Sequence, residues 1–350
     1  MYAWVTQIRN YFFDQGIFKA SEFDFPIINV GNLAVGGSGK TPHIEYLIRL
    51  LSADFQVATL SRGYGRKTKG YREVNLDSLP TESGDEPLQI KTNFPQVNVF
   101  VGEDRVEAVT QLLFYKPDTE VILLDDAYQH RAIKAGFNIL LTDYSKIFTR
   151  DKSMPFGRLR EFPSASKRAD MIIISKCPNQ ITEDQKTIFR NEIGGFSSAP
   201  ILFSEITYGE LFPFNTSGFS HSGFDEVLIV SGLANPTPMV QYIKQKFGPN
   251  KLEHLSFRDH HQFTQKDLVT IIEKFNKFAS QNKILVISEK DAVRLREISK
   301  NADFKKLPVF VLPIKISFLG ENKNIFNQAI KHYVRENKAD NSIYSKQDQL

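Results

Sequence analysis

Cysteine is nearly absent from this chain, and long apolar runs are missing. Cys177 is the one cysteine among 350 residues, so no disulfide can form within the chain, and a reducing compartment is indicated. No stretch reaches the roughly 18 apolar residues that a membrane-spanning helix needs. The start also lacks the pattern of a secretory signal, in which an apolar run and a small-residue cleavage site follow a charged segment. We therefore expect a protein that is cytoplasmic or contacts a membrane from the cytoplasmic side.

Neither basic nor acidic residues are in large excess. The formal net charge is only +4, which is too small to indicate nucleic-acid binding by itself. Basic residues do gather in two stretches, Arg62, Arg66, Lys67, Lys69 and Arg72 in one, and Arg158, Arg160, Lys167 and Arg168 in the other. Such patches could meet phosphates, anionic lipid headgroups or nucleic acid, or could be solvated faces. We find no repeats, and 41% hydrophobic residues suffice for a sizeable packed core.

Residues 1–20 read as a helix with a broad aromatic stripe. Large apolar side chains stand beside two cations, and the residues concerned are Trp4, Phe12, Phe13 and Phe18 with Arg9 and Lys19. A helix of this kind can lie in a membrane interface. The alternative is a stripe that packs on the domain it precedes. The pattern alone leaves both open.

Short β-rich runs then alternate with helix-like stretches. In the first half these runs are 27–30, 56–60, 97–101, 121–124, 138–142 and 171–175. The alternation predicts an α/β fold with a parallel sheet covered on both faces. The pattern breaks over 206–222 into glycine, proline, serine and asparagine, which is the best candidate for a domain boundary. A second alternating set follows.

A glycine-rich turn joins the first of these strands to a helix. After the strand at 27–30 come Ala34, Val35, Gly36, Gly37, Ser38, Gly39, Lys40 and Thr41. Glycines let the backbone turn tightly and aim its N–H groups at phosphate oxygens, and the helix N-terminus adds its positive end. Lys40 can reach the β- and γ-phosphates of a nucleotide, and the Thr41 hydroxyl can hold Mg²⁺. A turn that merely caps a helix is disfavoured, because strand, glycines, Lys-Thr and helix all occur in order.

Two successive carboxylates follow another apolar run. P-loop proteins need an acidic residue at the end of a neighbouring strand to hold the metal, and Asp125 and Asp126 come directly after 121–124. An exposed turn would also explain them, but their place in a chain with a P-loop favours the metal role. Which of the two contacts Mg²⁺ is not readable from the pattern.

Further motifs occur along the chain in a fixed order. They are VGNLAVGGSGKTP (30–42), SRGYGR (61–66), GDEP (84–87), EDR (103–105), LLDDAYQHR (123–131), GRLRE (157–161), SFRDHHQF (256–263) and SEKDAVRL (288–295). Together with the opening helix they resemble the tetraacyldisaccharide 4'-kinase family. No single motif is specific to the family. Their occurrence in the same order, from residue 2 to about residue 295, is specific.

The resemblance implies a reaction and a catalytic pair. The γ-phosphoryl group of ATP would pass to the 4'-hydroxyl of a tetraacylated glucosamine disaccharide 1-phosphate, giving lipid IVA, with ATP and Mg²⁺ as cofactors. The pair would be Asp85 in GDEP, acting on the proton of the sugar hydroxyl, and His260 in RDHH, holding that carboxylate and tuning its basicity. Lys40 and Asp126 are further catalytic candidates, since phosphoryl transfer depends mostly on positioning and charge neutralisation. Without the resemblance, Asp85 would pass for a loop or helix start and His260 for a surface turn.

Other residues of the matched motifs are candidates for substrate contact. They are Arg62, Arg66, Arg105, Gln129, His130, Arg160 and Glu161. For each of the charged ones, an ordinary ion pair is the alternative. The matched Lys290 and Asp291 have no assigned role.

The resemblance also implies two domains and a membrane. We expect a membrane-associating helix over 1–20, a P-loop NTPase-type core over 21–215, a smaller α/β lid over 216–312, a helix over 313–335 that could return to the core, and a polar tail over 336–350. The glycolipid substrate would stay in the bilayer. The protein should therefore be peripheral, at the cytoplasmic face of the inner membrane, with that membrane surface as a partner and no nucleic acid.

Two rival classes keep the P-loop but change the function. A GTPase switch would need an Asn-Lys-x-Asp turn after a strand, and the turn from Ser175 to Pro178 lacks the aspartate. An ATPase that binds or remodels nucleic acid would use the basic patches, and would show salt-sensitive binding to oligonucleotides.

Overall fold

The computed structural model describes residues 2–215 and 224–338, with side chains from residue 5 onward. The side chain of Trp4, residues 216–222 of the loose stretch at 206–222, and the tail from residue 339 lie outside the described residues. The chain forms two compact units, one made of Met1–Ile206 with Ile316–Leu350 and the other of Thr207–Lys315.

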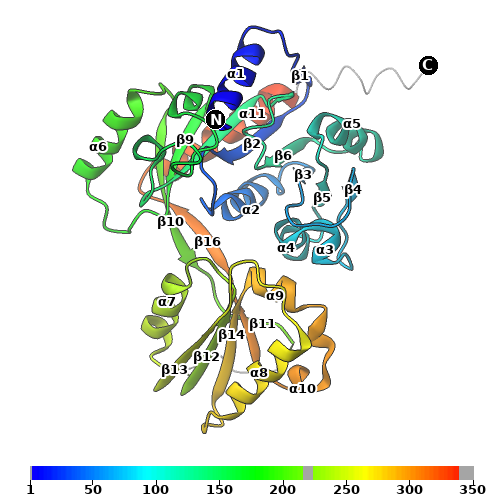
Figure 1. The fold of residues 1–350 in the computed structure, drawn as a ribbon, viewed down its shortest axis with the longest axis vertical. Helices are drawn as coiled ribbons and strands as arrows, with labels where there is room; N and C mark the ends of the chain where they lie inside the picture. The colour runs from blue at the N-terminus through cyan, green and yellow to red at the C-terminus, as the bar shows by residue number, and fades with distance from the viewer. Residues whose placement is uncertain (1, 216–223, 339–350) are drawn as a thin grey trace. The chain divides into compact units, whose positions relative to one another are not determined.

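The first unit is built on a nine-stranded sheet, in the order β16-β10-β9-β8-β2-β6-β3-β5-β4 (Figure 1). Its strands are β2 (Ile27–Asn32), β3 (Val57–Ser61), β4 (Arg72–Glu73), β5 (Asn98–Val101), β6 (Val121–Asp125), β8 (Phe137–Asp143), β9 (Met171–Ser175), β10 (Ile201–Tyr208) and β16 (Ile314–Phe318). From β10 to β5 the neighbours are parallel, and β4 is antiparallel to β5. Every residue of β2, β6 and β9 is buried, as expected for a sheet covered on both faces. The predicted fold class is confirmed.

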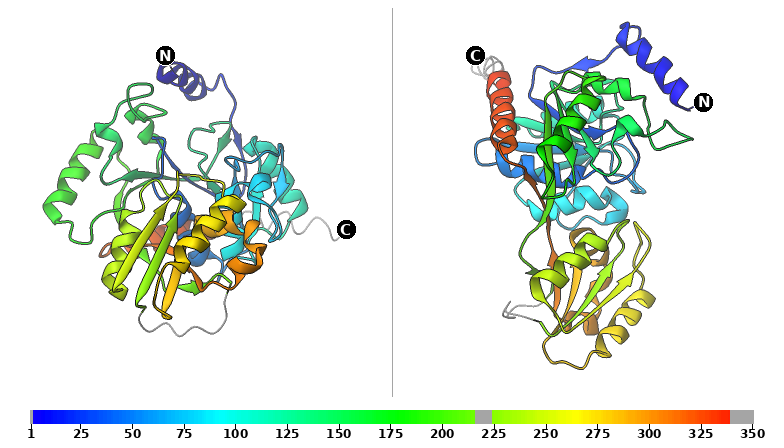
Figure 2. Two further views of the ribbon diagram at one scale, coloured as in Figure 1. Left: turned by 60° about the horizontal axis from the view of Figure 1, so that its bottom comes forward. Right: turned by 90° about the vertical axis from the view of Figure 1, so that its left-hand side faces the viewer.

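Helices and a small ribbon complete this unit. They are α1 (Tyr2–Asp14), α2 (Lys40–Leu51), α3 (Pro80–Ser83), α4 (Asp85–Asn93), α5 (Arg105–Tyr115), α6 (Glu183–Gly194) and α11 (Asn322–Lys338), with a parallel pair of β1 (Ser21–Glu22) and β7 (Ile133–Lys134). α5 begins where the Asp104 carboxylate accepts hydrogen bonds from the backbone N–H groups of Val106 and Glu107, and it buries Val109 and Leu112 against the sheet. α1 lies at the periphery of the unit in both views of Figure 2.

The last helix packs against the start of the central strand. The Tyr333 hydroxyl both donates to the carbonyl of Ile27 and accepts from its N–H, each at 3.1 Å. Tyr46 of α2 donates to Asn327 at 2.9 Å, and Lys331 pairs with Asp54 at 2.8 Å. α11 thus joins the first unit although the second unit separates it from that unit in sequence.

The second unit has its own five-stranded sheet, in the order β11-β15-β14-β12-β13. Its strands are β11 (Phe212–Pro213), β12 (Glu226–Ser231), β13 (Lys251–Ser256), β14 (Lys283–Ser288) and β15 (Val309–Leu312), and its helices are α7 (Thr237–Phe247), α8 (Gln265–Asn276), α9 (Glu289–Leu295) and α10 (Ala302–Lys305). Alternate residues of β12 enter two clusters, Val227 and Ile229 with α7, and Leu228 and Val230 with α8. The two helices therefore cover opposite faces, and this unit has a complete core of its own.

Several boundaries differ from those expected. The opening helix ends at Asp14, where Arg131 pairs with its carboxylate at 2.7 Å, rather than near residue 20. The second unit begins at Thr207 rather than 216, because β11 at Phe212–Pro213 already pairs with β15 of the second sheet. The apolar run at 309–314 divides into β15 and β16 around Pro313, and α11 continues to Lys338. Pairing partners distant in sequence decide these ends, so local composition could not place them.

Candidate active site

The turn from Leu33 to Gly39 has the backbone that its glycines predict. Gly36 and Gly39 have φ angles of 110° and 85°, a region that other residues enter only with strain. α2 begins at Lys40 immediately after Gly39, so the free N–H groups of its first turn point toward the loop. Ser38 of the loop and Thr41 of α2 are both buried. The predicted order of strand, P-loop and helix is present.

Polar groups at the ends of neighbouring strands hold this loop from below. The Ser175 hydroxyl donates to the carbonyl of Ser38 at 2.8 Å, and Lys176 donates to the carbonyl of Gly37 and pairs with Asp143 at 2.8 Å. Lys176 has a φ of 58°, so its backbone is strained where it turns toward the loop. These contacts occur because the carboxyl ends of parallel strands meet at one edge of the sheet.

His43 supports the loop from within α2. Its Nδ1–H donates to the carbonyl of Gly39 at 2.7 Å, which leaves Nε2 to accept from the Ser204 hydroxyl at 3.1 Å. Burial lowers the pKa of His43 to about 4, although the bond to Gly39 opposes the shift. The ring is therefore neutral at physiological pH.

Asp126 is the centre of a charged cluster beside the loop. Its carboxylate lies 3.6 Å from the Lys40 ammonium and 3.3 Å from the Arg160 guanidinium. The Asn32 side-chain oxygen also accepts from both cations, at 3.5 Å from Lys40 and 3.3 Å from Arg160. Burial acts to raise the pKa of Asp126, but Lys40 and then Arg160 outweigh burial, so the pKa lies below its ordinary value. Two cations thus converge at the mouth of the P-loop.

Asp125 and Asp126 differ in their surroundings. Asp125 is the last residue of β6 and is buried, whereas Asp126 is half-exposed and has a φ of 55°. The left-handed conformation of Asp126 turns the chain sharply after the strand, a backbone that aspartate adopts more readily than most residues. The predicted metal role of Thr41, Asp125 and Asp126 stays a prediction.

Gln129 joins the cluster, and His130 and Arg105 lie next to it. The Gln129 amide donates to the carbonyl of Asn32 at 2.8 Å and accepts from Arg160 at 3.1 Å. His130 Nε2 accepts from the backbone N–H of Arg105 at 3.4 Å, and burial together with the Arg105 charge lowers the pKa of His130. Arg105 is itself buried, and burial and the nearby Arg62 lower its pKa to about 10.

Other substrate candidates are engaged in ion pairs within the protein. Arg66 pairs with Glu103 at 2.7 Å and donates to the carbonyl of Gly70, also at 2.7 Å, which closes the loop between them. Glu161 is buried and pairs with Arg168 at 2.6 Å, with Arg9 of α1 at 3.8 Å. Arg62 is exposed. For Arg66 and Glu161, the ion pairs offered as the alternative are therefore present.

Asp85 is the first residue of α4 in the first unit. Gly84 precedes it with a φ of 91°, and a Cβ there would lie 2.9 Å from the carbonyl oxygen of Tyr64, so the SRGYGR and GDEP segments are in contact. Glu45 of α2 accepts from Gln89 and Asn93 of α4, at 2.9 and 3.0 Å. The helix that begins with Asp85 is therefore tied to the helix that begins with Lys40.

His260 lies in the second unit, on an exposed turn after β13. Its φ is 56°, and its Nδ1 accepts from Arg294 at 3.2 Å. The neighbouring His261 pairs instead with Asp267, at 3.0 Å. Because Asp85 and His260 belong to different units, their pairing stays a prediction.

The family is decided by comparison with known sequences. A sequence profile described as tetraacyldisaccharide-1-P 4'-kinase matches residues 1–335. The chain belongs to this family. Proteins named tetraacyldisaccharide 4'-kinase from Phocaeicola vulgatus and Flavobacterium psychrophilum are 39% and 41% identical to it, over 96% and 95% of this chain and 93% and 94% of theirs. The resemblance expected from the motifs is confirmed.

A solved structure of the same family has the same fold. The chain matches a crystal structure of LpxK from Aquifex aeolicus in complex with ATP, with a TM-score of 0.71 and 27% identity over 95% of this chain and 96% of that one. The family is one of kinases, so the predicted enzyme class is confirmed, and the ATP in the relative supports the use of ATP.

Within the part of the chain that the structure describes, no helix is long and apolar enough to cross a bilayer. No group of three or more His, Cys, Asp and Glu side chains in that part could hold a metal ion.

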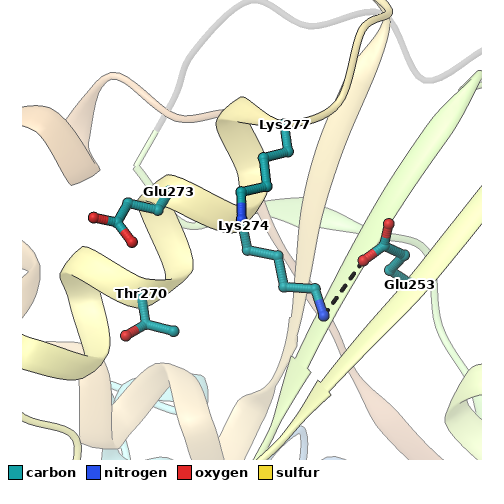
Figure 3. Close-up of a pocket in the computed structure, with 5 residues that line it drawn as sticks. All are labelled: Glu253, Thr270, Glu273, Lys274 and Lys277. Carbon is teal, nitrogen blue, oxygen red and sulfur yellow. Dashed lines mark ion pairs between the residues drawn. The ribbon is translucent and has the colours of Figure 1, made fainter.

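The pocket drawn in Figure 3 lies in the second unit between α8 and β13. It is lined by Glu253, Thr270, Glu273, Lys274 and Lys277, with Lys274 paired to Glu253 at 3.3 Å. None of the residues singled out from the sequence lines it. We assign it no part in phosphate transfer.

Three residues near the P-loop and the charged cluster have no role that the sequence predicts. Asn32 lies within VGNLAVGGSGKTP and is buried where it contacts both cations. A polar residue at the end of an apolar strand was its signal. The sequence indicates Lys176 only as part of an incomplete GTPase motif and Arg9 only as a cation beside the membrane. In the structure Lys176 contacts Gly37 of the P-loop, and Arg9 donates to the carbonyl of Gln129 at 3.0 Å.

Proposed function

We propose that this chain transfers the γ-phosphoryl group of ATP to the 4'-hydroxyl of a tetraacyldisaccharide 1-phosphate, giving lipid IVA for lipid A biosynthesis. The observation that carries the proposal is the convergence of Lys40 and Arg160 on Asp126 at the mouth of an intact P-loop. Family membership supplies the acceptor, which the site geometry alone does not identify.

The P-loop holds the triphosphate, and the two cations neutralise it. The backbone N–H groups of Gly37 to Lys40 and the first turn of α2 bind phosphate oxygens. Lys40 and Arg160 move from Asp126 to the more highly charged phosphate and stabilise the charge that spreads over the γ-phosphoryl oxygens during transfer. Asp126 holds both side chains in place until nucleotide arrives.

Thr41, Asp125 and Asp126 would hold Mg²⁺. A bound ion would supply positive charge that offsets the negative charge of the phosphates. The donor set fits, because Mg²⁺ in kinases commonly takes one or two carboxylates and completes its shell with water and phosphate oxygens.

Asp85 is the group that accepts the proton of the sugar hydroxyl, with His260 as its partner. Asp85 is half-buried at the start of α4, and the Glu45 contacts couple that helix to the P-loop helix. These contacts support a fixed distance between the base and the triphosphate, which phosphoryl transfer requires.

The test is phosphate transfer from labelled ATP to the disaccharide 1-phosphate in mixed micelles. Asp85→Asn and His260→Ala should each slow transfer by about a hundredfold or more, whereas binding of a fluorescent ATP analogue persists. Matched controls are Asp118→Asn and His332→Ala, both at exposed positions. Near-normal rates in both test variants would overturn the assignment, and ATP hydrolysis stimulated by oligonucleotides would favour the rival nucleic-acid class.

We infer a peripheral protein at the cytoplasmic face of the inner membrane, the location implied by the family's glycolipid substrate. Contact with the membrane is supported by α1, whose polar side chains face the unit and whose apolar side chains face outward. Its polar residues Thr6 and Asn10 face the unit, with exposures of 8% and 4%, while Val5, Ile8 and Tyr11 face outward with 63%, 54% and 55%. Arg9 and Arg131 hold this orientation through contacts with Gln129 and with the carbonyl of Asn10. An outward apolar face is costly in water and suits a lipid surface, where the glycolipid substrate resides.

A further inference from the structure

A buried ion pair in the second unit ends at His260. Asp291 is fully buried, and the Arg294 side chain is 3% exposed. The two side chains lie one turn apart on α9, with 3.2 Å between Arg294 Nη1 and Asp291 Oδ1. Burying two charges is expensive and is often no more stabilising than an apolar pair, so the placement calls for a reason other than stability.

Asp291 is held in one orientation by three donors. Its Oδ2 accepts from the Ser288 hydroxyl at 2.6 Å, and its Oδ1 accepts from the backbone N–H of Gly232 at 3.1 Å in addition to Arg294. Arg294 Nη1 also donates to the carbonyl of Gly232, at 3.0 Å. The guanidinium is thereby fixed against the end of β12.

The other terminal nitrogen of this guanidinium, Nη2, reaches His260. Arg294 Nη2 lies 3.2 Å from His260 Nδ1. A guanidinium has donors only, so Nδ1 must accept and carries no proton. The neutral ring then bears its proton on Nε2, which the contact leaves directed away from Arg294.

The turn that carries His260 is fitted closely to this pair. A Cβ on Gly232 would lie 3.1 Å from the carbonyl oxygen of Arg258, 3.2 Å from Asp291 Oδ1 and 3.4 Å from the Cβ of His261. The Asp259 carboxylate accepts from the N–H of His260 at 3.0 Å, and His260 takes its left-handed backbone there. Gly232 therefore lets the turn approach the buried pair, and the φ of His260 aims its ring at Arg294.

We propose that Arg294, oriented by Asp291, is a positioning residue that fixes His260 as the Nε2–H tautomer. Resting on the proposed function, the consequence is that His260 acts in phosphate transfer as an N–H donor through Nε2 and not as a base.

The test reads the tautomer directly in the whole protein. Nitrogen-15 NMR of histidine-labelled chain, at a pH of about 8 where an ordinary histidine is neutral, should show His260 with an unprotonated Nδ1 and a protonated Nε2. The His260→Asn variant assigns the resonance. An Nδ1–H form, or a rapid mixture of both forms, in the unaltered protein overturns the proposal without any further variant.

Variants then separate positioning from mere stability. Arg294→Gln should convert His260 to a tautomer mixture and lower kcat by about ten- to a hundredfold, with KM for ATP unchanged. Arg294→Lys retains a cationic donor, so it should recover part of the single tautomer and part of kcat. Arg296→Gln, at an exposed position of the same segment, should change neither the tautomer of His260 nor kcat. If His260→Ala retains full transfer, the proposed role of His260 fails while the tautomer result still stands on its own.

Discussion

At the scale of single residues, the burial of His43 makes the stability of the protein depend on pH. Its pKa falls from 6.5 to about 4 on burial, so between these values the unfolded chain binds a proton that the folded chain does not. Stability therefore falls as pH is lowered from 6.5 to 4 and is fully retained above 6.5. At about 1.4 kcal/mol per pKa unit, the loss from this group is about 3 kcal/mol.

Urea unfolding at a series of pH values measures this loss. His43→Gln, which keeps one donor and one acceptor, should lack this part of the pH dependence, so its difference from the unaltered protein narrows toward pH 4. The control is His332→Gln on the exposed face of α11. A difference between His43→Gln and the unaltered protein that stays constant across the range would contradict the prediction.

Some residues of the site can be assigned from the sequence, and others cannot. Gly36, Gly39, Lys40 and Thr41 could be assigned because their roles follow from local order along the chain. The meeting of Arg160 and Asn32 at Asp126 could not, because it depends on the neighbours of β2 in the sheet. The left-handed backbone of Asp126 also has no sequence signal beyond the residue type.

At the scale of elements, Glu45 joins α2 to α4. It is buried, and its carboxylate accepts from Arg49, Gln89 and Asn93. Glu45→Ala removes this shared acceptor, so we expect the free energy of unfolding to fall by about 1–3 kcal/mol. Transfer should slow more than ATP binding weakens, because Asp85 begins α4.

Chemical denaturation and steady-state kinetics test both parts. Glu107→Ala, an exposed glutamate in the first turn of α5, should change stability by no more than about 0.5 kcal/mol. Loss of stability in Glu45→Ala with unchanged kcat would show that the two helices are packed together without coupling to catalysis.

The outward apolar face of α1 predicts that this helix binds lipid. Ile8→Glu places a charge on its outward apolar face, and burial of such a side chain in lipid contributes about 1.5–3 kcal/mol, or at least roughly tenfold in partitioning. Sedimentation with anionic liposomes should therefore show at least tenfold weaker binding. Gln7→Glu adds the same charge at a polar exposed position, and its binding to liposomes should weaken far less. Equal binding by both variants and the unaltered chain would exclude α1 as the contact.

Element identities were predictable where the pattern was local. The runs that became β2, β3, β5, β6, β8 and β9 were found because buried parallel strands are continuous apolar runs. α4 was missed as a full helix, since GDEP opens it with two acids and a proline, a combination equally typical of a loop. The polar inner face of α1 was also missed, because sequence shows the stripe and not which side of the helix the protein covers.

At the scale of the whole molecule, the chain leaves the first unit after β10 and returns in β16, the strand next to β10 in the sheet. The family resemblance implied that the last helix could return to the core, but it did not indicate that α11 contacts β2 and α2, because such contacts carry no local pattern. A unit inserted between neighbouring strands needs little of its host for folding. Each unit also has its own sheet and buried clusters.

Independent cores predict that nucleotide stabilises the two units unequally. ATP at about 100 times its Kd should stabilise the unit that binds it by about 2.7 kcal/mol. In hydrogen exchange, the most protected amides of β2 and α2 should therefore slow about a hundredfold with ATP and Mg²⁺, while the core strands β12 and β14 keep their rates. Lys40→Ala should abolish the slowing without altering β12 and β14. Equal slowing in both sheets would mean that the two units unfold as one, and that the buried clusters of the second unit depend on nucleotide bound to the first.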